Sequence, residues 1–234
     1  MQIADGVYSI GQKQGGHVHA YLFEDDGKLT LVDTLFDKDA HRILNLIRQI
    51  GRNPQDLKHI LLTHAHRSHL GGLAKLRELS GALVHAHEWE ADIIAGERAQ
   101  QPVSLVPQGS MKTYHLRVGL ALGLSKHPPC PVDQTLSEGD EVGPLQVIHI
   151  PGHTPGHMAF HDERRGVLSV GDAVASWPHV GAGWPGFNLN EGQYRLSFRR
   201  LTKFEAKVVA VGHGEPLVNG AADRVHELAE RLRG

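Results

Sequence analysis

Apolar residues along the chain follow a pattern that predicts short β-strands separated by helices. Stretches in which apolar residues alternate with polar ones, or form a short unbroken run, are typical of strands. The predicted strands lie within residues 6–11, 19–25, 28–34, 59–64, 82–87, 135–142, 145–152, 157–163, 167–173 and 207–214. Asp26 and Gly27 fall between two of these stretches and favour a tight hairpin turn.

Other stretches carry apolar residues three and four positions apart, which predicts helices. The predicted helices lie within residues 36–51, 73–81, 88–96, 111–124, 191–204 and 221–233. Strands and helices therefore alternate, although several neighbouring strands are close enough to form hairpins. We predict an α/β (α+β) chain in which mixed sheets are faced by helices.

Residues 97–133 depart from this pattern. The segment is loop-like at its start and rich in proline at its end, with one predicted helix between. We interpret it as an insertion or lid over one edge of a site. No repeat and no linker divides the chain, so we expect residues 1–234 to form one domain.

Composition and charge exclude several classes of function. Lys and Arg total 24 against 26 Asp and Glu, a net charge of −2, which disfavours a nucleic-acid partner held by bulk charge. No apolar run approaches the ~20 residues of a membrane span, and no signal peptide is visible, so we expect a cytoplasmic protein without a membrane partner. Cys130 is the single cysteine, which excludes an intramolecular disulfide and a cysteine-based metal site.

The histidine content points to a metal site instead, because the chain has 18 histidines and imidazole is the commonest metal ligand. His64, His66 and His69 lie within six residues, directly after a predicted buried strand. The side chains of His64 and His66 point the same way if the strand continues, so both can reach one cation. His69 lies beyond a turn and is expected to face a neighbouring position.

Four further candidate residues follow the same pattern of an apolar strand and then a polar side chain. They are Asp33, His153, Asp172 and His213. Strand ends that converge on one edge of a sheet commonly form a functional site. We therefore expect these residues to join the three histidines of the 64–69 loop.

Together these motifs resemble the metallo-β-lactamase superfamily, whose motifs match from about residue 6 to residue 215. The resemblance implies an αββα sandwich of two mixed sheets flanked by helices. It implies one ion held by His64, His66 and His153 and a second served by His69 and His213, with Asp172 bridging both and Asp33 supporting the loop. PGHTPGH, residues 151–157, is most similar to the glyoxalase-II-like and lactonase-like branches.

Ser68 departs from the family pattern, which has an aspartate at this position of the metal loop. A neutral hydroxyl is a poorer ligand than a carboxylate, so we expect a weakened second site that could leave a one-metal enzyme. In the family this aspartate also orients the attacking water, a role that Ser68 can take only through a hydrogen bond. The competing interpretations are a hydrolase with an altered second site, a binding protein without turnover, an introduced substitution, and a compensating ligand such as His19 or His85.

The resemblance implies a metal-dependent hydrolase that cleaves a thioester, lactone or related ester with water activated by a metal ion. We assign catalytic roles to Asp172, Ser68 and Asp33. We expect one or two Zn²⁺ ions, with iron or manganese as alternatives, a small-molecule substrate and possible homodimers. An iron-dependent oxidative enzyme like persulfide dioxygenase and a non-catalytic metal-binding relative remain as alternatives, whereas a nuclease or phosphodiesterase is disfavoured.

For seven other residues we favour a structural role over a role in the site. They are Arg67, His157, His85, His87, His17, His19 and Cys130. Trp177, Trp184 and Phe187 lie where a substrate wall could form, although loop packing is the simpler interpretation. Tyr194 could donate a hydrogen bond to a substrate carbonyl, but its helical context favours a structural role.

Overall fold

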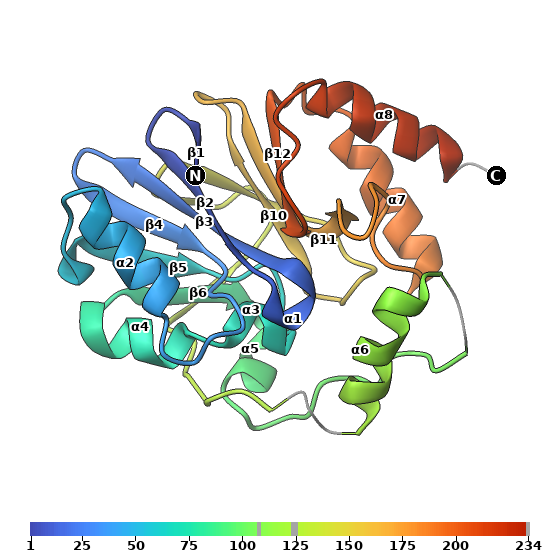
Figure 1. Ribbon diagram of the computed structural model, residues 1–234, viewed down its shortest axis with the longest axis horizontal. Coiled ribbons are helices and arrows are strands. Elements are labelled where there is room, and N and C mark those ends of the chain that lie inside the picture. Colours follow the sequence, from blue (N-terminus) through green and yellow to red (C-terminus); the bar gives the residue numbers. More distant parts are fainter. Residues whose placement is uncertain (107–108, 123–125, 233–234) are drawn as a thin grey trace.

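A computed structural model describes residues 1–106, 109–122 and 126–232 (Figure 1). The predicted helix 111–124 is α6 (Met111–Ala121), and its last two predicted residues lie outside the described part. The other helices are α1 (Gln14–His17), α2 (His41–Gln49), α3 (Arg67–Leu70), α4 (Leu73–Ser80), α5 (Glu88–Ile94), α7 (Glu191–Leu201) and α8 (Ala221–Arg231), with a 3-10 turn, η1 (Pro54–Asp56).

The strands form one curled sheet. They are β1 (Gln2–Ala4), β2 (Val7–Gln12), β3 (Val18–Asp25), β4 (Lys28–Val32), β5 (Leu57–Leu61), β6 (Leu83–His87), β7 (Gln134–Leu136), β8 (Glu141–Val142), β9 (Leu145–His149), β10 (Met158–Asp162), β11 (Val167–Ala175) and β12 (Val208–His213). The order across the sheet is β7-β6-β5-β4-β3-β12-β11-β10-β9-β8, with β2 also paired to β3 and β1 to β2.

The two sheets of the predicted sandwich are joined at one edge. β3 and β12 are antiparallel neighbours, and Val18 faces His213 in their register. The two halves then fold onto each other and bury an apolar layer between them. The first half contributes Val7, Tyr21, Phe23, Val32 and Leu61, and the second contributes Val147, Met158, Phe160, Val167, Val208 and Ala210. Each large apolar side chain buried in this way contributes roughly 1.5–3 kcal/mol to folding.

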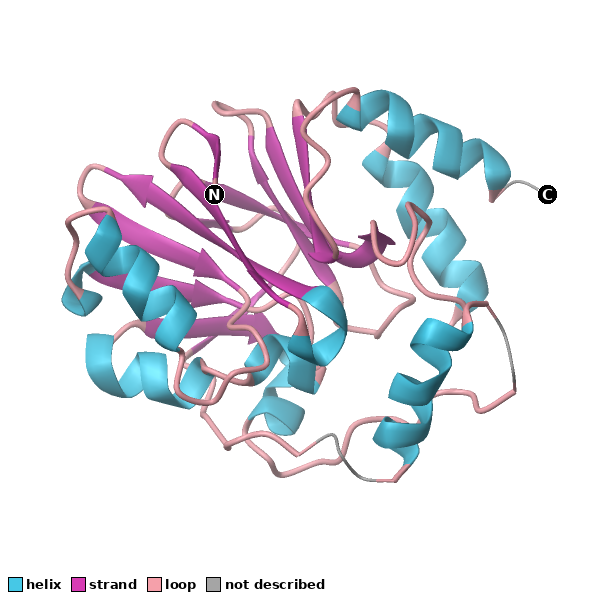
Figure 2. Cartoon of the chain, viewed as in Figure 1, coloured by secondary structure: helices cyan, strands magenta, loops and turns pink. Residues whose placement is uncertain are grey.

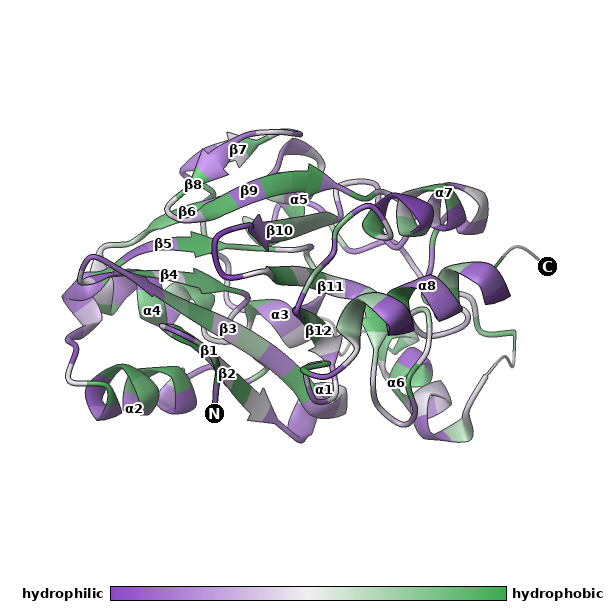
Figure 3. Ribbon diagram, turned by 90° about the horizontal axis from the view of Figure 1, so that it is seen from above, coloured by the Kyte–Doolittle hydropathy of each residue, from purple (hydrophilic) through white to green (hydrophobic). Residues whose placement is uncertain are grey.

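Helices cover the outer face of each half (Figure 2). On the first half, α2 buries Ile43, Leu44 and Ile47, the face that its apolar spacing predicts, and α4 and α5 lie over the same core. On the second half, α7 and α8 enclose a separate apolar core. Hydrophobic residues lie along the strands between these layers, while polar residues face outward on the helices (Figure 3). The α/β metallo-β-lactamase architecture is therefore confirmed.

One edge of this sheet gathers the polar strand ends. β4, β5 and β6 are parallel, β12 runs in the same direction through the antiparallel β3, and β11 and β9 share that direction. The carboxyl ends of these strands consequently lie along one edge, which α6 faces from the segment 97–133 (Figure 1). Among the described residues, no helix has both the length and the apolar character to span a membrane.

Candidate metal centre

Three predicted histidines meet just beyond β5 and β9. His64 Nε2 lies 2.9 Å from His66 Nδ1, and His153 Nε2 lies 3.1 Å from the same nitrogen. All three rings are buried. Three imidazole nitrogens that converge this closely form a ligand set for one divalent cation.

Asp172, on β11, lies between this group and a second one. Its Oδ2 is 3.7 Å from His64 Nε2 and 3.3 Å from His213 Nε2, and its Oδ1 is 3.3 Å from His69 Nε2. Within each group, His64–His66–His153–Asp172 and His69–Asp172–His213, the candidate ligand atoms lie within 4.8 Å of one another. The structure thus brings all six predicted side chains together, with the carboxylate of Asp172 shared by the two groups.

Gly212 on β12 makes room for this carboxylate. A Cβ atom at residue 212 would lie 2.1 Å from Asp172 Oδ1, far inside van der Waals contact. The glycine before His213 is therefore required for Asp172 to occupy the centre of the site.

The outer nitrogens of four of the histidine rings are held by neighbouring groups. Asp33 Oδ2 accepts a hydrogen bond from His69 Nδ1 at 2.8 Å, and the Gly16 carbonyl accepts one from His213 Nδ1 at 2.8 Å. Thr63 Oγ1 lies 3.0 Å from His64 Nδ1, and Asn188 Oδ1 lies 3.2 Å from His153 Nδ1. Partners of this kind orient imidazole ligands and select the tautomer whose inner nitrogen has a free lone pair.

The protonation states fit the same interpretation. Burial lowers the pKa values of His64, His66 and His153, which keeps these rings neutral at pH 7 and able to bind a cation. Burial opposes ionisation of Asp172, but His213 and His69 hold its pKa well below the usual range. Burial also opposes protonation of His69, yet Asp33 and Asp172 raise its pKa to about 10, so a cation has to displace this proton.

Two buried polar atoms of the second group lie 3.3 Å apart without a well-formed hydrogen bond, which leaves both available to a cation. Within the part of the chain that the structure describes, His69 Nε2 and Asp172 Oδ1 are buried and have no hydrogen-bond partner. Such atoms are costly in a folded protein unless an ion or water satisfies them. The donor set of imidazole and carboxylate suits zinc, iron or manganese.

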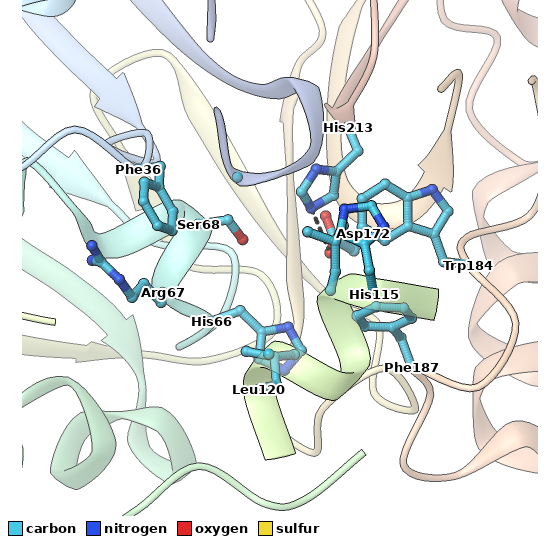
Figure 4. A pocket seen from close by; sticks show the side chains of 13 residues that line it. Phe36, His66, Arg67, Ser68, His115, Leu120, Asp172, Trp184, Phe187 and His213 are labelled. Carbon is cyan, nitrogen blue, oxygen red and sulfur yellow. Dashed lines mark ion pairs between the residues drawn. The ribbon is translucent and has the colours of Figure 1, made fainter. Parts of the chain in front are cut away.

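A pocket with a volume of about 240 Å³ opens onto this centre (Figure 4). Its floor includes His66, Ser68, Asp172 and His213, and its remaining walls are Gly15, Phe36, Arg67, His115, Leu116, Gly119, Leu120, Trp184 and Phe187. Most of these wall residues are apolar. Arg67 carries the permanent positive charge among them, and its guanidinium lies 4.0 Å from the ring centroid of Phe36.

The structure also shows the surroundings of the residues that the sequence favoured as structural. Trp184 and Phe187 line the pocket, whereas Trp177 does not and stacks on His17 instead. His157 is buried with its ring centroid 5.1 Å from that of His64. Tyr194 is buried and donates its hydroxyl to the Ala173 carbonyl, so it is unavailable to a substrate.

Four further residues that the sequence favoured as structural do not line this pocket. They are His19, His85, His87 and Cys130. Neither His19 nor His85 belongs to the two groups of candidate ligand atoms, so neither replaces the missing aspartate of the metal loop. Ser68 lines the same pocket as Asp172 and His213 of the second group.

The sequence interpretation missed Phe36, His115 and the pair Leu116 and Leu120 as pocket residues. The two leucines are four positions apart on α6, so they share one face of that helix, and this spacing was the available signal. Phe36 follows Asp33 by three residues, in a loop whose course the apolar pattern does not fix.

The comparisons with known proteins agree with this geometry. The family model described as the metallo-beta-lactamase superfamily matches residues 14–213. The protein YobT of Bacillus subtilis (strain 168) is 29% identical over 226 residues, which cover 92% of this chain and 91% of YobT. The hydroxyacylglutathione hydrolase of Rhodobacter capsulatus is also 29% identical over 226 residues, covering 92% of this chain and 72% of that enzyme.

Among solved structures, that of TTHA1623 in a di-iron-bound form superposes with a TM-score of 0.67 at 26% identity. The alignment covers 93% of this chain and 98% of TTHA1623. The buried histidine and aspartate centre, the fold and the family match together identify the chain as a metallo-hydrolase of the metallo-beta-lactamase superfamily.

Proposed function

We propose that this protein hydrolyses a thioester, lactone or related ester whose acyl side is apolar. The observation that carries the proposal is the apolar pocket that opens onto the histidine and aspartate centre. A substrate whose carbonyl lies at the centre would place its apolar part against Leu116, Leu120 and Phe187. Burying a methylene group there is worth roughly 0.8 kcal/mol, so affinity should grow with chain length until the pocket is full.

The residues of the centre would hold one or two divalent cations. Zinc is the ion we propose, and iron and manganese suit the same donors. A bound cation supplies water of lowered pKa and polarises the scissile carbonyl. Asp172 belongs to both groups of candidate ligands and lines the pocket floor, where its carboxylate can orient water by accepting a hydrogen bond.

Asp33 and Ser68 act on the second group. Asp33 orients His69 through its hydrogen bond, and Ser68 offers a hydroxyl at the floor of the pocket where the family pattern has a carboxylate. A hydroxyl can orient water by hydrogen bonding but cannot neutralise a cation. We therefore propose that the second group binds its ion more weakly than the three-histidine group.

Most of the pocket wall suits an apolar acyl group, and the Arg67 guanidinium can pair with an anionic group of the substrate. Arg67 is the permanent cation among the described lining residues, and its guanidinium lies over the Phe36 ring. Small molecules with an apolar acyl group are therefore the proposed partners.

A substrate panel tests this proposal. The protein, with the metal content it has after purification, is assayed against esters, thioesters and lactones with acyl chains of two to eight carbons. We expect hydrolysis whose kcat/KM rises with acyl length. Absence of turnover in every series with full metal loading would favour a non-catalytic binding protein, and oxygen consumption with a persulfide substrate would favour the oxidative alternative.

A further inference from the structure

Glu90, on α5, lies behind the metal centre and outside its ligand set. Its side chain is buried, with 1% of its surface exposed. One carboxylate oxygen, Oε2, accepts a hydrogen bond from the backbone N–H of Ala65 at 3.0 Å. The other, Oε1, accepts one from the backbone N–H of Gly156 at 3.1 Å and one from the Thr154 hydroxyl.

Two of these three partners adjoin a histidine of the first group. Ala65 lies between His64 and His66, and Thr154 directly follows His153. The 64–66 loop and the 153–156 loop come from different strands and are far apart in the sequence. A single carboxylate therefore connects the two loops that together carry the three converging imidazoles.

The surroundings are built to admit this carboxylate. A Cβ atom at residue 156 would lie 2.7 Å from Glu90 Cγ, so Gly156 allows the close approach. On the opposite side, Gln100 donates a hydrogen bond to the Ala65 carbonyl. Both backbone groups of Ala65 are thus fixed by side chains from outside the loop.

Glu90 has no ion-pair partner among the described residues. The nearby Arg98 pairs with Asp92 and donates to the Trp89 carbonyl instead. Burial raises the pKa of Glu90 to about 7 despite its three hydrogen bonds. An anion that is buried without a paired cation is costly, and a cation held by the adjoining histidines would offset part of that cost.

We propose that Glu90 is a positioning residue of the three-histidine site, which clamps the 64–66 loop to the 153–156 loop and so sets both the affinity and the ligand geometry of the bound cation. The requirement is for a carboxylate and not merely for a side chain of this size. A glutamine has one acceptor oxygen, so its NH₂ group would face either the N–H of Ala65 or the N–H of Gly156.

The test compares Glu90→Gln with Glu88→Gln, a matched control because Glu88 is exposed and precedes Glu90 by two residues on the same helix. Zinc affinity is measured by competition with a chromophoric chelator, and the ligand-field absorption of the Co²⁺-loaded protein reports ligand geometry. We expect Glu90→Gln to bind Zn²⁺ about 10- to 100-fold more weakly and to shift the Co²⁺ spectrum, with Glu88→Gln unchanged.

Circular dichroism and cooperative unfolding of the metal-free variants establish that they fold. A folded Glu90→Gln variant with wild-type zinc affinity and Co²⁺ spectrum would overturn the proposal and leave Glu90 as a packing residue. If Glu90→Gln does not fold, Thr154→Val removes one of the three hydrogen bonds, and its unchanged affinity and spectrum would overturn the proposal equally. These readouts need no substrate, so they are independent of the proposed hydrolysis.

Discussion

Asp33 fixes the orientation of His69, because Asp33 Oδ2 accepts a hydrogen bond from His69 Nδ1 at 2.8 Å. The bond assigns the proton to Nδ1 and turns the other nitrogen, Nε2, toward Asp172 Oδ1 at 3.3 Å. Asp33 also accepts hydrogen bonds from the backbone N–H and the hydroxyl of Thr63, which hold the carboxylate itself in place. The strand-end aspartate and the metal loop therefore form one unit.

Replacing Asp33 with asparagine should weaken metal binding by the second group. The amide has one acceptor oxygen, so its NH₂ group faces either the backbone N–H of Thr63 or Nδ1 of His69. The first arrangement loosens the hold on the side chain of residue 33, and the second favours the His69 tautomer that carries its proton on Nε2. We expect an about 10- to 100-fold loss of affinity for that group's ion, measured by metal titration of the stripped protein. The exposed Asp39→Asn is the control, and equal loss in both variants would contradict this explanation.

Replacing Ser68 with aspartate should strengthen the second group. A carboxylate at the pocket floor adds a negative charge and an anionic ligand beside His69, His213 and Asp172. We expect the metal content per chain to rise and the hydrolysis rate to rise with it. Ser68→Asn introduces a side chain of nearly the same shape as aspartate but without its charge, and it should raise neither the metal content nor the rate. The opposite result would be a wild-type protein that already binds two ions tightly and a Ser68→Asp variant with the same metal loading and rate. This result would show that Ser68 does not weaken metal binding by the second group.

The pocket wall predicts a graded effect of chain length. Leu120 lines the pocket, while Leu122 lies just beyond the same helix with 76% of its surface exposed. We expect Leu120→Asn to reduce kcat/KM for octanoyl substrates about 10-fold or more and to affect acetyl substrates little, because only the long chain loses apolar contact. Leu122→Asn should behave as wild type. Equal losses of kcat/KM for octanoyl and acetyl substrates would show that this wall does not determine specificity for acyl length.

Buried histidines should make the metal-free protein sensitive to acid. Burial, followed by the neighbouring charge of His59, lowers the pKa of His85 from 6.5 to about 4. The unfolded chain therefore takes up a proton at pH 6.5 and below while the native protein does not. The contribution of neutral, buried His85 to the free energy of unfolding is therefore complete above pH 6.5 and is lost as the pH falls toward 4.

The measurement is urea unfolding at pH 7.5 and pH 5.0. We expect His85→Gln to reduce the drop in unfolding free energy between the two pH values by at most about 2 kcal/mol, since the variant removes this one titration. His226→Gln changes an exposed histidine and should leave the drop unaltered. A drop that is as large in His85→Gln as in the wild type would contradict the assignment.

Much of the fold and of the site was predictable because both depend on local signals. Apolar runs locate the strands, and polar residues directly after them, such as His64 and His213, fall at the carboxyl ends that a parallel arrangement places on one edge. The family motifs then added the ion assignment and the sandwich architecture. The joining of the two sheets through β3 and β12 was not predictable, because it depends on one long-range strand pair.

Glu90 shows what sequence patterns leave out. On α5 it shares the buried face with Ile93 and Ile94, three and four positions later, so its burial had a readable signal. Its three acceptor bonds, however, reach loops that the chain brings together only after folding. The pocket has the same origin, since Phe36 and Leu120 come from distant segments.

Metal dependence of hydrolysis tests the central claim most directly. The protein is purified without added metal, its metal content per chain is determined by elemental analysis, and the rate on the best substrate of the panel is measured before chelation, after chelation and after stoichiometric zinc, iron or manganese is restored. We predict at least one equivalent of a divalent ion per chain, loss of the activity on stripping, and its return with one of these metals. A stripped protein that is folded, free of metal and still hydrolyses the substrate at the original rate would contradict the claim.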